Sequence, residues 1–322
     1  MSPTVLITGA AGFVGHHVAD EARRLGVDLR LMLHRRPLPG PVGQPPPGAR
    51  APMTFEADLA EPGSLRGVCA GVDVLLHCAA RIGGSPQDNE RVNARGTRAL
   101  VDEARRAGVS RIVQVSTASV YGRGTYRRAR PQDLARNPQS PTSATRAVAE
   151  DAVLAADGIV LRPHLVHGPG DTWFVPGLSG LLRALPGTVE GWPARLSAVS
   201  VHDLARLTVL TGLAPRRNLT ASVYHVAPVE PVTVRDLLRA VADCAGLPWP
   251  ERDLTVHQAR NLLHGEPRLR HALDMLVTDH WFDGGPLRSD LAAAPGPDFA
   301  ESFSRYAPWY RTVLGGARSR GA

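Results

Sequence analysis

The chain has 322 residues, of which 43% are hydrophobic, so it is long enough to bury the core of one large domain or of two coupled ones. Its net charge of +7 comes from 37 basic residues, all arginine and scattered along the sequence, which does not indicate a nucleic-acid partner. No apolar run is long enough to span a bilayer, so we expect a soluble, cytoplasmic protein that binds neither nucleic acid nor membranes.

The first predicted unit is a strand, a tight turn and a helix. The apolar run Thr4–Ile7 leads into three glycines at fixed offsets, and the amphipathic run Phe13–Leu25 follows. In such a unit the glycines let the chain reverse, let the backbone approach a pyrophosphate, and let the helix pack closely on the strand. The pattern predicts a dinucleotide-binding turn with the phosphates at the helix N-terminus, although an ordinary strand–helix connection has the same shape. The predicted cofactor contacts here are Thr8, Gly9, Gly12, Phe13, Val14 and Gly15.

Short apolar strands alternate with helices through the first half of the chain. The strands are predicted over 28–33, 53–57, 72–77, 111–116 and 159–162, and the clearest helices over 89–107 and 142–155. This alternation predicts the α/β class, with a Rossmann-type doubly wound parallel sheet and helices on both faces. The segment Arg36–Pro52 contains seven prolines and predicts a loop.

The pattern changes after Arg162, where Pro and Gly become frequent and the alternation is lost. We predict a nucleotide-binding Rossmann domain over 1–163, to which 198–227 returns as a strand, a helix and a strand. Residues 164–197 and 228–316 are predicted to form a smaller mixed α/β substrate-binding lobe, and 317–322 a flexible tail.

Seven short motifs follow one another along the chain. They are the glycine turn, Ala57-Asp58-Leu59, His77-Cys78-Ala79-Ala80, Asn93 with Gly96-Thr97, Ser116-Thr117-Ala118-Ser119-Val120-Tyr121-Gly122, Leu161-Arg162-Pro163 with Gly168-Pro169-Gly170, and Val201-His202-Asp203-Leu204-Ala205. In this order they resemble the extended short-chain dehydrogenase/reductases over nearly the whole chain. The resemblance implies a nicotinamide cofactor, and it implies that the protein is a monomer or a homodimer. The further cofactor contacts that it implies are Asp58, Leu59, Ala79, Ala80, Arg81 and Pro163.

The second predicted strand ends in His34-Arg35-Arg36, and the resemblance implies that cofactor choice is made here. An acidic residue at this place would bond to a free ribose hydroxyl, whereas guanidinium groups suit a ribose phosphate. We therefore predict NADP(H). The alternative is that these arginines only begin the proline-rich loop.

The predicted active site departs from the family pattern. The family uses a Ser or Thr after the fifth strand and a Tyr and a Lys four residues apart at the start of the next helix. Here Thr117 matches the first, Thr142 stands in place of the tyrosine, and Arg146 stands in place of the lysine. A phenol has a pKa near ~10 that a nearby cation can lower, but an aliphatic hydroxyl is a far weaker acid. Alcohol oxidation would lack its base, whereas carbonyl reduction can take its proton from substrate or water.

These residues predict an NADPH-dependent ketoreductase that acts on a small-molecule aromatic ketone of the polyketide type. In this hypothesis Thr117 and Thr142 orient the carbonyl and Arg146 holds the nicotinamide ribose. The segment Leu276–Asp283 resembles members that act on flat hydrophobic ketones, and no diphosphate-binding segment is found near Glu251–Leu276. The predicted substrate-binding residues are Ser85, Thr117, Ser119 and His164.

Two other functions remain open. One is a regulator that senses NADP(H) without catalysis, and the other is a sugar-nucleotide epimerase or dehydratase, which needs a base that the sequence does not identify. His164 is a candidate acid or a packing residue, and Tyr126 is a candidate phenol whose arginine neighbours suggest exposure. No metal is expected, because the three cysteines lack metal-ligand spacing.

Overall fold

The computed structural model describes residues 2–40, 47–48 and 50–315. Within these residues, seven parallel strands form the central sheet in the order β12-β7-β5-β4-β1-β2-β3. Their bounds are β1 Thr4–Thr8, β2 Asp28–Leu33, β3 Met53–Glu56, β4 Val74–His77, β5 Arg111–Val115, β7 Ile159–Pro163 and β12 Val223–Val226. The order runs outward from β1 in both directions, so the predicted Rossmann-type, doubly wound α/β fold is confirmed.

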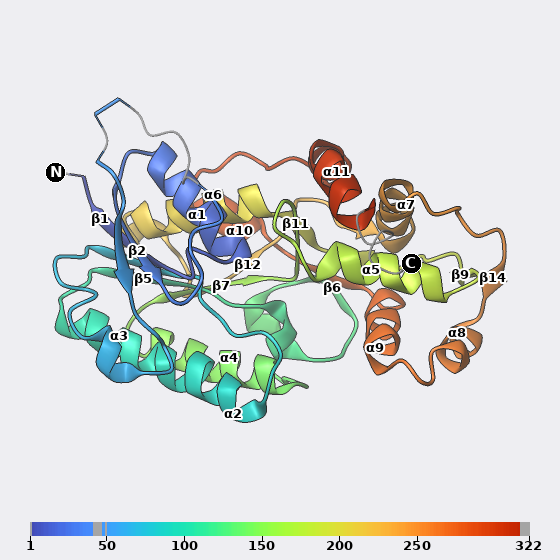
Figure 1. Ribbon diagram of the computed structural model, residues 1–322, viewed down its shortest axis with the longest axis horizontal. Helices are drawn as coiled ribbons and strands as arrows, with labels where there is room; N and C mark the ends of the chain where they lie inside the picture. The colour runs from blue at the N-terminus through green and yellow to red at the C-terminus, as the bar shows by residue number, and fades with distance from the viewer. Residues whose placement is uncertain (1, 41–46, 49, 316–322) are drawn as a thin grey trace.

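Helices cover both faces of this sheet (Figure 1). One face carries α1 (Phe13–Arg24), α6 (Val201–Leu213) and α10 (Gly285–Asp290), whose apolar side chains share a core with the strands. The other face carries α2 (Pro86–Asn89), α3 (Thr97–Arg106) and α4 (Pro141–Leu154), and a second core lies beneath α3 and α4. The buried strands read as continuous apolar runs because both of their faces are covered.

A smaller lobe lies beside the sheet and has its own core (Figure 1). Its helices are α5 Phe174–Ala184, α7 Val234–Ala245, α8 Val256–Leu262, α9 Pro267–Leu276 and α11 Phe299–Gly315. A four-stranded sheet joins β13 (Val232–Thr233), β10 (Arg195–Leu196), β15 (His280–Phe282) and β6 (Tyr126–Ala129). Two strand pairs complete the lobe, β8 (Leu165–His167) with β11 (Ala198–Ser200) and β9 (Thr188–Val189) with β14 (Asp253–Leu254).

The chain crosses between the two halves more often than the sequence indicates. Within the segment 198–227, β12 pairs with β7 in the central sheet, whereas β11 pairs with β8. In the other direction, β6 leaves the first half of the chain to pair with β15. The domain bounds at 163/164 and 197/198 remain a prediction, and the predicted tail lies outside the described residues.

One predicted helix is divided in the structure. Residues 89–107 are predicted as continuous, but α2 ends at Asn89, a π-helical turn spans Glu90–Gly96, and α3 begins at Thr97. Two of the residues there are tied to other elements. Asn93 bonds to the backbone of Arg81, and a Cβ on Gly96 would lie 2.5 Å from the carbonyl oxygen of Leu59. These long-range contacts have no counterpart in the helical periodicity of the sequence.

The proline-rich loop is confirmed only in part. Residues 36–40, 47–48 and 50–52 form neither helix nor strand, and the rest of the loop lies outside the described residues. No helix in the described part of the chain is long and apolar enough to cross a membrane.

Candidate active site

The glycine turn between β1 and α1 is packed too tightly for side chains. Gly9 has a φ of +71°, and a Cβ there would lie 2.8 Å from the backbone of Ala79 at the end of β4. A Cβ on Gly15 would lie 2.1 Å from the carbonyl oxygen of Gly9. The absence of side chains therefore lets three backbone segments meet at the carboxyl ends of β1 and β4, where ligands bind in sheets of this kind.

The start of α1 fits a pyrophosphate. Gly12 is exposed at the N-cap, no side chain caps the helix, and its first turn carries no acidic residue. The backbone N–H groups of this turn are therefore free of side-chain competitors and suit an anion. Phe13 and Val14 follow as half-buried residues of the same turn.

Thr8 and Leu59 take structural positions. The Thr8 hydroxyl lies 2.7 Å from Nδ1 of buried His77, and it accepts a hydrogen bond from the amide of Ala79. Leu59 is 5% exposed and belongs to the core beneath α3. The Thr8 and Leu59 side chains, both predicted as cofactor contacts, therefore make contacts within the protein.

The end of β2 faces the loop that follows β3. His34 Nε2 lies 3.0 Å from the carboxylate of Asp58, whose other oxygen accepts the amide of Ala60 at 2.8 Å. Arg35 and Arg36 are exposed, and neither pairs with an acid among the described residues. Arg35 and Arg36, whose guanidinium groups have no acidic partner among the described residues, therefore directly follow a histidine that is paired with Asp58.

Thr117 begins a short 3-10 turn directly after β5. Its hydroxyl accepts the amide of Ser119 and donates to the Ser119 hydroxyl, both at 3.1 Å. Thr117 is half-buried and Ser119 is exposed, so this bond lies where a ligand oxygen can replace it. Since Val115 of β5 pairs with Leu161 of β7, Thr117 and Pro163 each lie two residues further on, at the carboxyl ends of these strands.

Thr142 is fully committed within the protein. Its hydroxyl donates to Oδ1 of Asn89 at 3.0 Å and accepts the amide of Gly83 at 3.3 Å. Asn89 in turn donates to the carbonyl oxygens of Gly83 and Ser85, both at 2.9 Å. Thr142, which stands in place of the family tyrosine, therefore ties α4 to the turn after β4. Its hydroxyl hydrogen is already engaged in the hydrogen bond to Asn89.

The same turn is held from its other end by Asn93. The amide of Arg81 donates to Asn93 Oδ1 at 2.7 Å, and Asn93 donates back to the Arg81 carbonyl at 3.0 Å. Ser85 caps α2 by accepting the amide of Asp88, so its hydroxyl has a structural use at an exposed position. Ala80 is exposed between these anchors. The sequence motif includes Asn93, but no pattern in the sequence marks Asn89.

Arg146 lies one helical turn beyond Thr142. It donates to the carbonyl oxygen of Val115 at 2.7 Å, and its buried Nε has no partner among the described residues. Burial lowers the pKa of Arg146 to about 10, which still leaves it charged at neutral pH. A positive charge is therefore held against the carboxyl end of β5.

A buried ion pair between Glu150 and Arg162 contacts Ser116, the residue before Thr117. Glu150 of α4 accepts hydrogen bonds from Arg162 at 2.5 and 2.9 Å and from Ser116 at 2.5 Å. Arg162 also donates to the Tyr121 hydroxyl, which lies 2.7 Å from Nε2 of His225. This chain of contacts joins α4, β7 and β12 to the residues around Thr117, and sequence spacing gives no signal for it.

Six rings pack together where the lobe meets the central sheet, and we call them the aromatic cluster. They are Tyr121, Tyr126, His164, His225, His280 and Phe282. Tyr126 is half-buried, and its hydroxyl donates to the carbonyl oxygen of Tyr121 at 3.1 Å, although its arginine neighbours suggest exposure. His164 is also half-buried, and it contacts the same two rings as Tyr126, those of His280 and Phe282. The exposed side of the cluster therefore belongs to these two residues.

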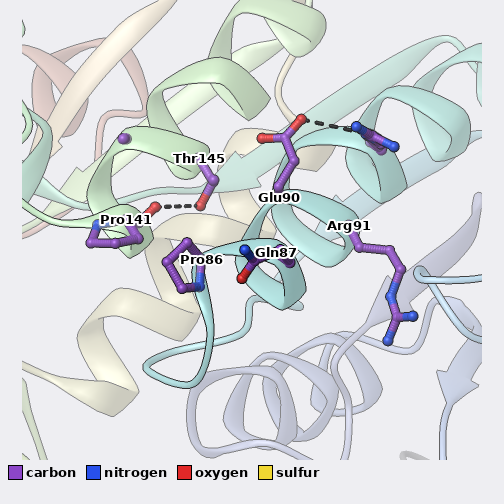
Figure 2. A pocket seen from close by; sticks show the side chains of 8 residues that line it. Pro86, Gln87, Glu90, Arg91, Pro141 and Thr145 are labelled. Atoms are coloured by element: carbon purple, nitrogen blue, oxygen red, sulfur yellow. Dashed lines mark hydrogen bonds and ion pairs between the residues drawn. The ribbon is translucent and has the colours of Figure 1, made fainter.

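An open groove of about 590 Å³ lies elsewhere, between α4 and the segment Pro86–Arg95. Figure 2 shows Thr145 bonded to the carbonyl oxygen of Pro141 on one wall, with Glu90 and Arg91 on the other. None of the residues predicted for cofactor, catalysis or substrate lines this groove. The candidate active site lies instead at the carboxyl ends of the strands, where the glycine turn follows β1, Thr117 follows β5 and His164 follows β7, and where Arg146 contacts the last residue of β5.

The family model described as "NAD dependent epimerase/dehydratase family" matches residues 5–226. The chain belongs to this family. The matched range runs from the second residue of β1 to the last residue of β12 and so takes in all seven strands of the central sheet except Thr4.

Relatives in this family include ketoreductases. The 2-alkyl-3-oxoalkanoate reductase of Stenotrophomonas maltophilia (strain K279a) is 28% identical, over 94% of this chain and 97% of the relative. The 4-hydroxy-2-methyl-3-oxo-4-farnesyl-3,4-dihydroquinoline-1-oxide ketoreductase of Stigmatella aurantiaca is 27% identical, over 83% and 80%. Among solved structures, Bordetella bronchiseptica WbmH in complex with NAD+ has a TM-score of 0.75 at 22% identity, covering 97% of this chain and 99% of that one. This last likeness is one of fold.

Proposed function

We propose that this protein is an NADPH-dependent ketoreductase that reduces a carbonyl of a polycyclic aromatic, polyketide-type substrate to an alcohol. The observation that carries the proposal is the hydrogen bonding of the Thr142 hydroxyl. The family position of the tyrosine holds this threonine and therefore no phenol. The threonine hydroxyl already donates a hydrogen bond to Asn89 Oδ1. Alcohol oxidation, with which epimerases and dehydratases begin, would lack a base there.

Carbonyl reduction needs less from the protein. When bound, the dihydronicotinamide supplies a hydride to the carbonyl carbon, and the carbonyl π electrons move to oxygen. The Thr117 hydroxyl can turn from Ser119 to this oxygen, because its present partner is the hydroxyl of an exposed residue. The proton for the alkoxide then comes from a substrate phenol next to the carbonyl or from water. Arg146 keeps a positive charge near the developing negative charge.

The names of two relatives support the reaction class. Both are reductases of a 3-oxo group, and one acts on a fused-ring quinoline oxide. The exposed Arg35 and Arg36 support NADPH over NADH, since a ribose phosphate would find two free guanidinium groups there. Because it lacks the tyrosine, this site resembles that of the angucyclinone ketoreductases in the family that also lack it.

The test is consumption of NADPH with 8-hydroxy-1-tetralone and with its methyl ether, 8-methoxy-1-tetralone. We expect turnover of the free phenol, at least ~10-fold slower turnover of the ether, and slower reaction with NADH than with NADPH. Turnover should fall in a Thr117→Val variant, which lacks the hydroxyl, and a Thr117→Ser variant, which keeps it, serves as the control. Tight NADPH binding without turnover of either ketone would overturn the reductase and favour the NADP(H)-sensing regulator.

A further inference from the structure

His164 stands at the point where the central sheet, the lobe and the predicted reaction centre meet. It directly follows Pro163, the last residue of β7, and the neighbouring strand β5 ends two residues before Thr117, with Val115 paired to Leu161. Its ring stacks on His280 with centroids 5.5 Å apart and an angle of 25°, and it meets Phe282 edge-on at 5.5 Å. Contacts from β15 therefore fix the plane of the imidazole.

One nitrogen of this ring is buried and unused. His164 Nε2 has no hydrogen-bond partner within the described residues. Buried polar groups in folded proteins are nearly always paired, and an unpaired one lowers stability. By contrast, the other imidazoles of the cluster are engaged, His225 with the Tyr121 hydroxyl and His280 with the carbonyl oxygen of Thr278.

The imidazole is held neutral. Burial, followed by the neighbouring His280 and His225, lowers the pKa of His164 to about 3. The titratable groups that act on it are His280 on β15 and His225 on β12, with Arg162 next to His225 and the Tyr126 ring of β6 packed on His280. No carboxylate is among these groups, so nothing there favours the imidazolium. A neutral imidazole offers one N–H donor and no transferable proton at pH 5–8.

We propose that His164 is a substrate-positioning residue, whose Nε2–H donates a hydrogen bond to an oxygen of a flat aromatic ketone lying against the half-buried rings of His164 and Tyr126. This inference rests on the proposed reductase function and adds a second donor to Thr117. The ring plane fixed by His280 sets the direction of the bond, so the donor selects the face of the ketone that meets the cofactor.

The experiment compares three variants with the wild type. His164→Phe keeps a flat ring without a donor, His164→Gln places an amide N–H near the position of Nε2, and His280→Phe is the matched packing control. We expect kcat/KM for 8-hydroxy-1-tetralone to fall ~10- to 100-fold in His164→Phe. His164→Gln should recover most of this loss, and His280→Phe should lose less than His164→Phe. Wild-type kcat/KM should show no step from His164 between pH 5 and 8.

A binding measurement separates this inference from the proposed function. The affinity of the NADP+-loaded protein for 8-hydroxy-1-tetralone is measured by calorimetry, whether or not the ketone is reduced. Weaker binding in His164→Phe with unchanged NADP+ affinity supports the hydrogen bond, even if wild-type turnover is absent and the reductase assignment fails. Equal binding in His164→Phe and wild type, no recovery in His164→Gln, or no ketone binding at all would overturn it.

Discussion

At the scale of single residues, the most consequential substitution is the threonine at the family tyrosine position. Thr142 does not imitate a phenol, because its hydroxyl is bonded on both sides, to Asn89 and to Gly83. It holds the turn after β4 against α4. The loss of one kind of chemistry is thus accompanied by the gain of a structural tie at the same position.

The two hydrogen bonds of the Thr142 hydroxyl predict how its variants behave. Thr142→Val has nearly the same shape but leaves Asn89 and Gly83 without their partner, so we expect a loss of about 1–2 kcal/mol in the free energy of unfolding. Turnover should fall only modestly, with an unchanged pH profile. Thr142→Ser, which keeps the hydroxyl, should match the wild type in both. Urea denaturation and steady-state kinetics measure these quantities. A large fall in kcat with unchanged stability would instead identify Thr142 as a proton donor.

At the scale of elements, the buried ion pair between Glu150 and Arg162 joins α4 to β7. Both elements pack around the turn that begins at Thr117, because Glu150 also bonds to Ser116. Glu150 is fully buried, and its carboxylate has three cationic or hydroxyl partners, Arg162, Ser116 and, at 3.5 Å, Arg136. Removal of one partner leaves a charge in an apolar interior, which costs more than the pair itself contributes.

We therefore expect Arg162→Met to lower the free energy of unfolding by about 3–5 kcal/mol. The double variant Glu150→Met/Arg162→Met should be more stable than Arg162→Met alone, because no uncompensated carboxylate remains. Urea denaturation of the two single variants and the double variant forms a complete cycle. Additive losses would show that the two side chains act independently.

Sequence reasoning works for elements whose signal is local. The glycine turn is readable because Gly9, Gly12 and Gly15 serve one strand and one helix within fifteen residues. The division of the predicted helix at 89–107 is not readable, since the contact of Asn93 with Arg81 arises only in the folded chain. The aromatic cluster joins His164 to His280 and Phe282, which lie more than a hundred residues further along. Nothing in the local sequence marks rings that meet at such a separation.

At the scale of the whole molecule, several histidines are buried in their neutral form. Burial lowers the pKa of His77 to about 4 and the pKa values of His164, His167 and His225 to about 3. In the unfolded chain each would titrate near ~6.5. Below that pH the unfolded state binds protons that the native state does not, so stability is greatest above pH 6.5 and falls as the pH is lowered toward 4.

Each such histidine contributes a slope of up to about 1.4 kcal/mol per pH unit in this window. We expect the urea midpoint to fall steadily between pH 7 and pH 5. His167 packs among Phe299, Phe303 and Tyr306, so His167→Phe suits the site and should make the fall shallower. A midpoint that stays constant over this range, or an unchanged slope in the variant, would contradict the prediction.

The pairing of β6 with β15 has a consequence for the modularity of the protein. One strand of the lobe's main sheet is supplied from the first half of the chain, and β12, at the edge of the central sheet, is supplied from the second. A fragment cut after residue 163 would leave β7 as an open edge and β6 without a neighbour, a pair of surfaces prone to aggregation. Grafting a relative's substrate lobe onto this nucleotide domain therefore requires several splices made together, one of them around residues 126–129.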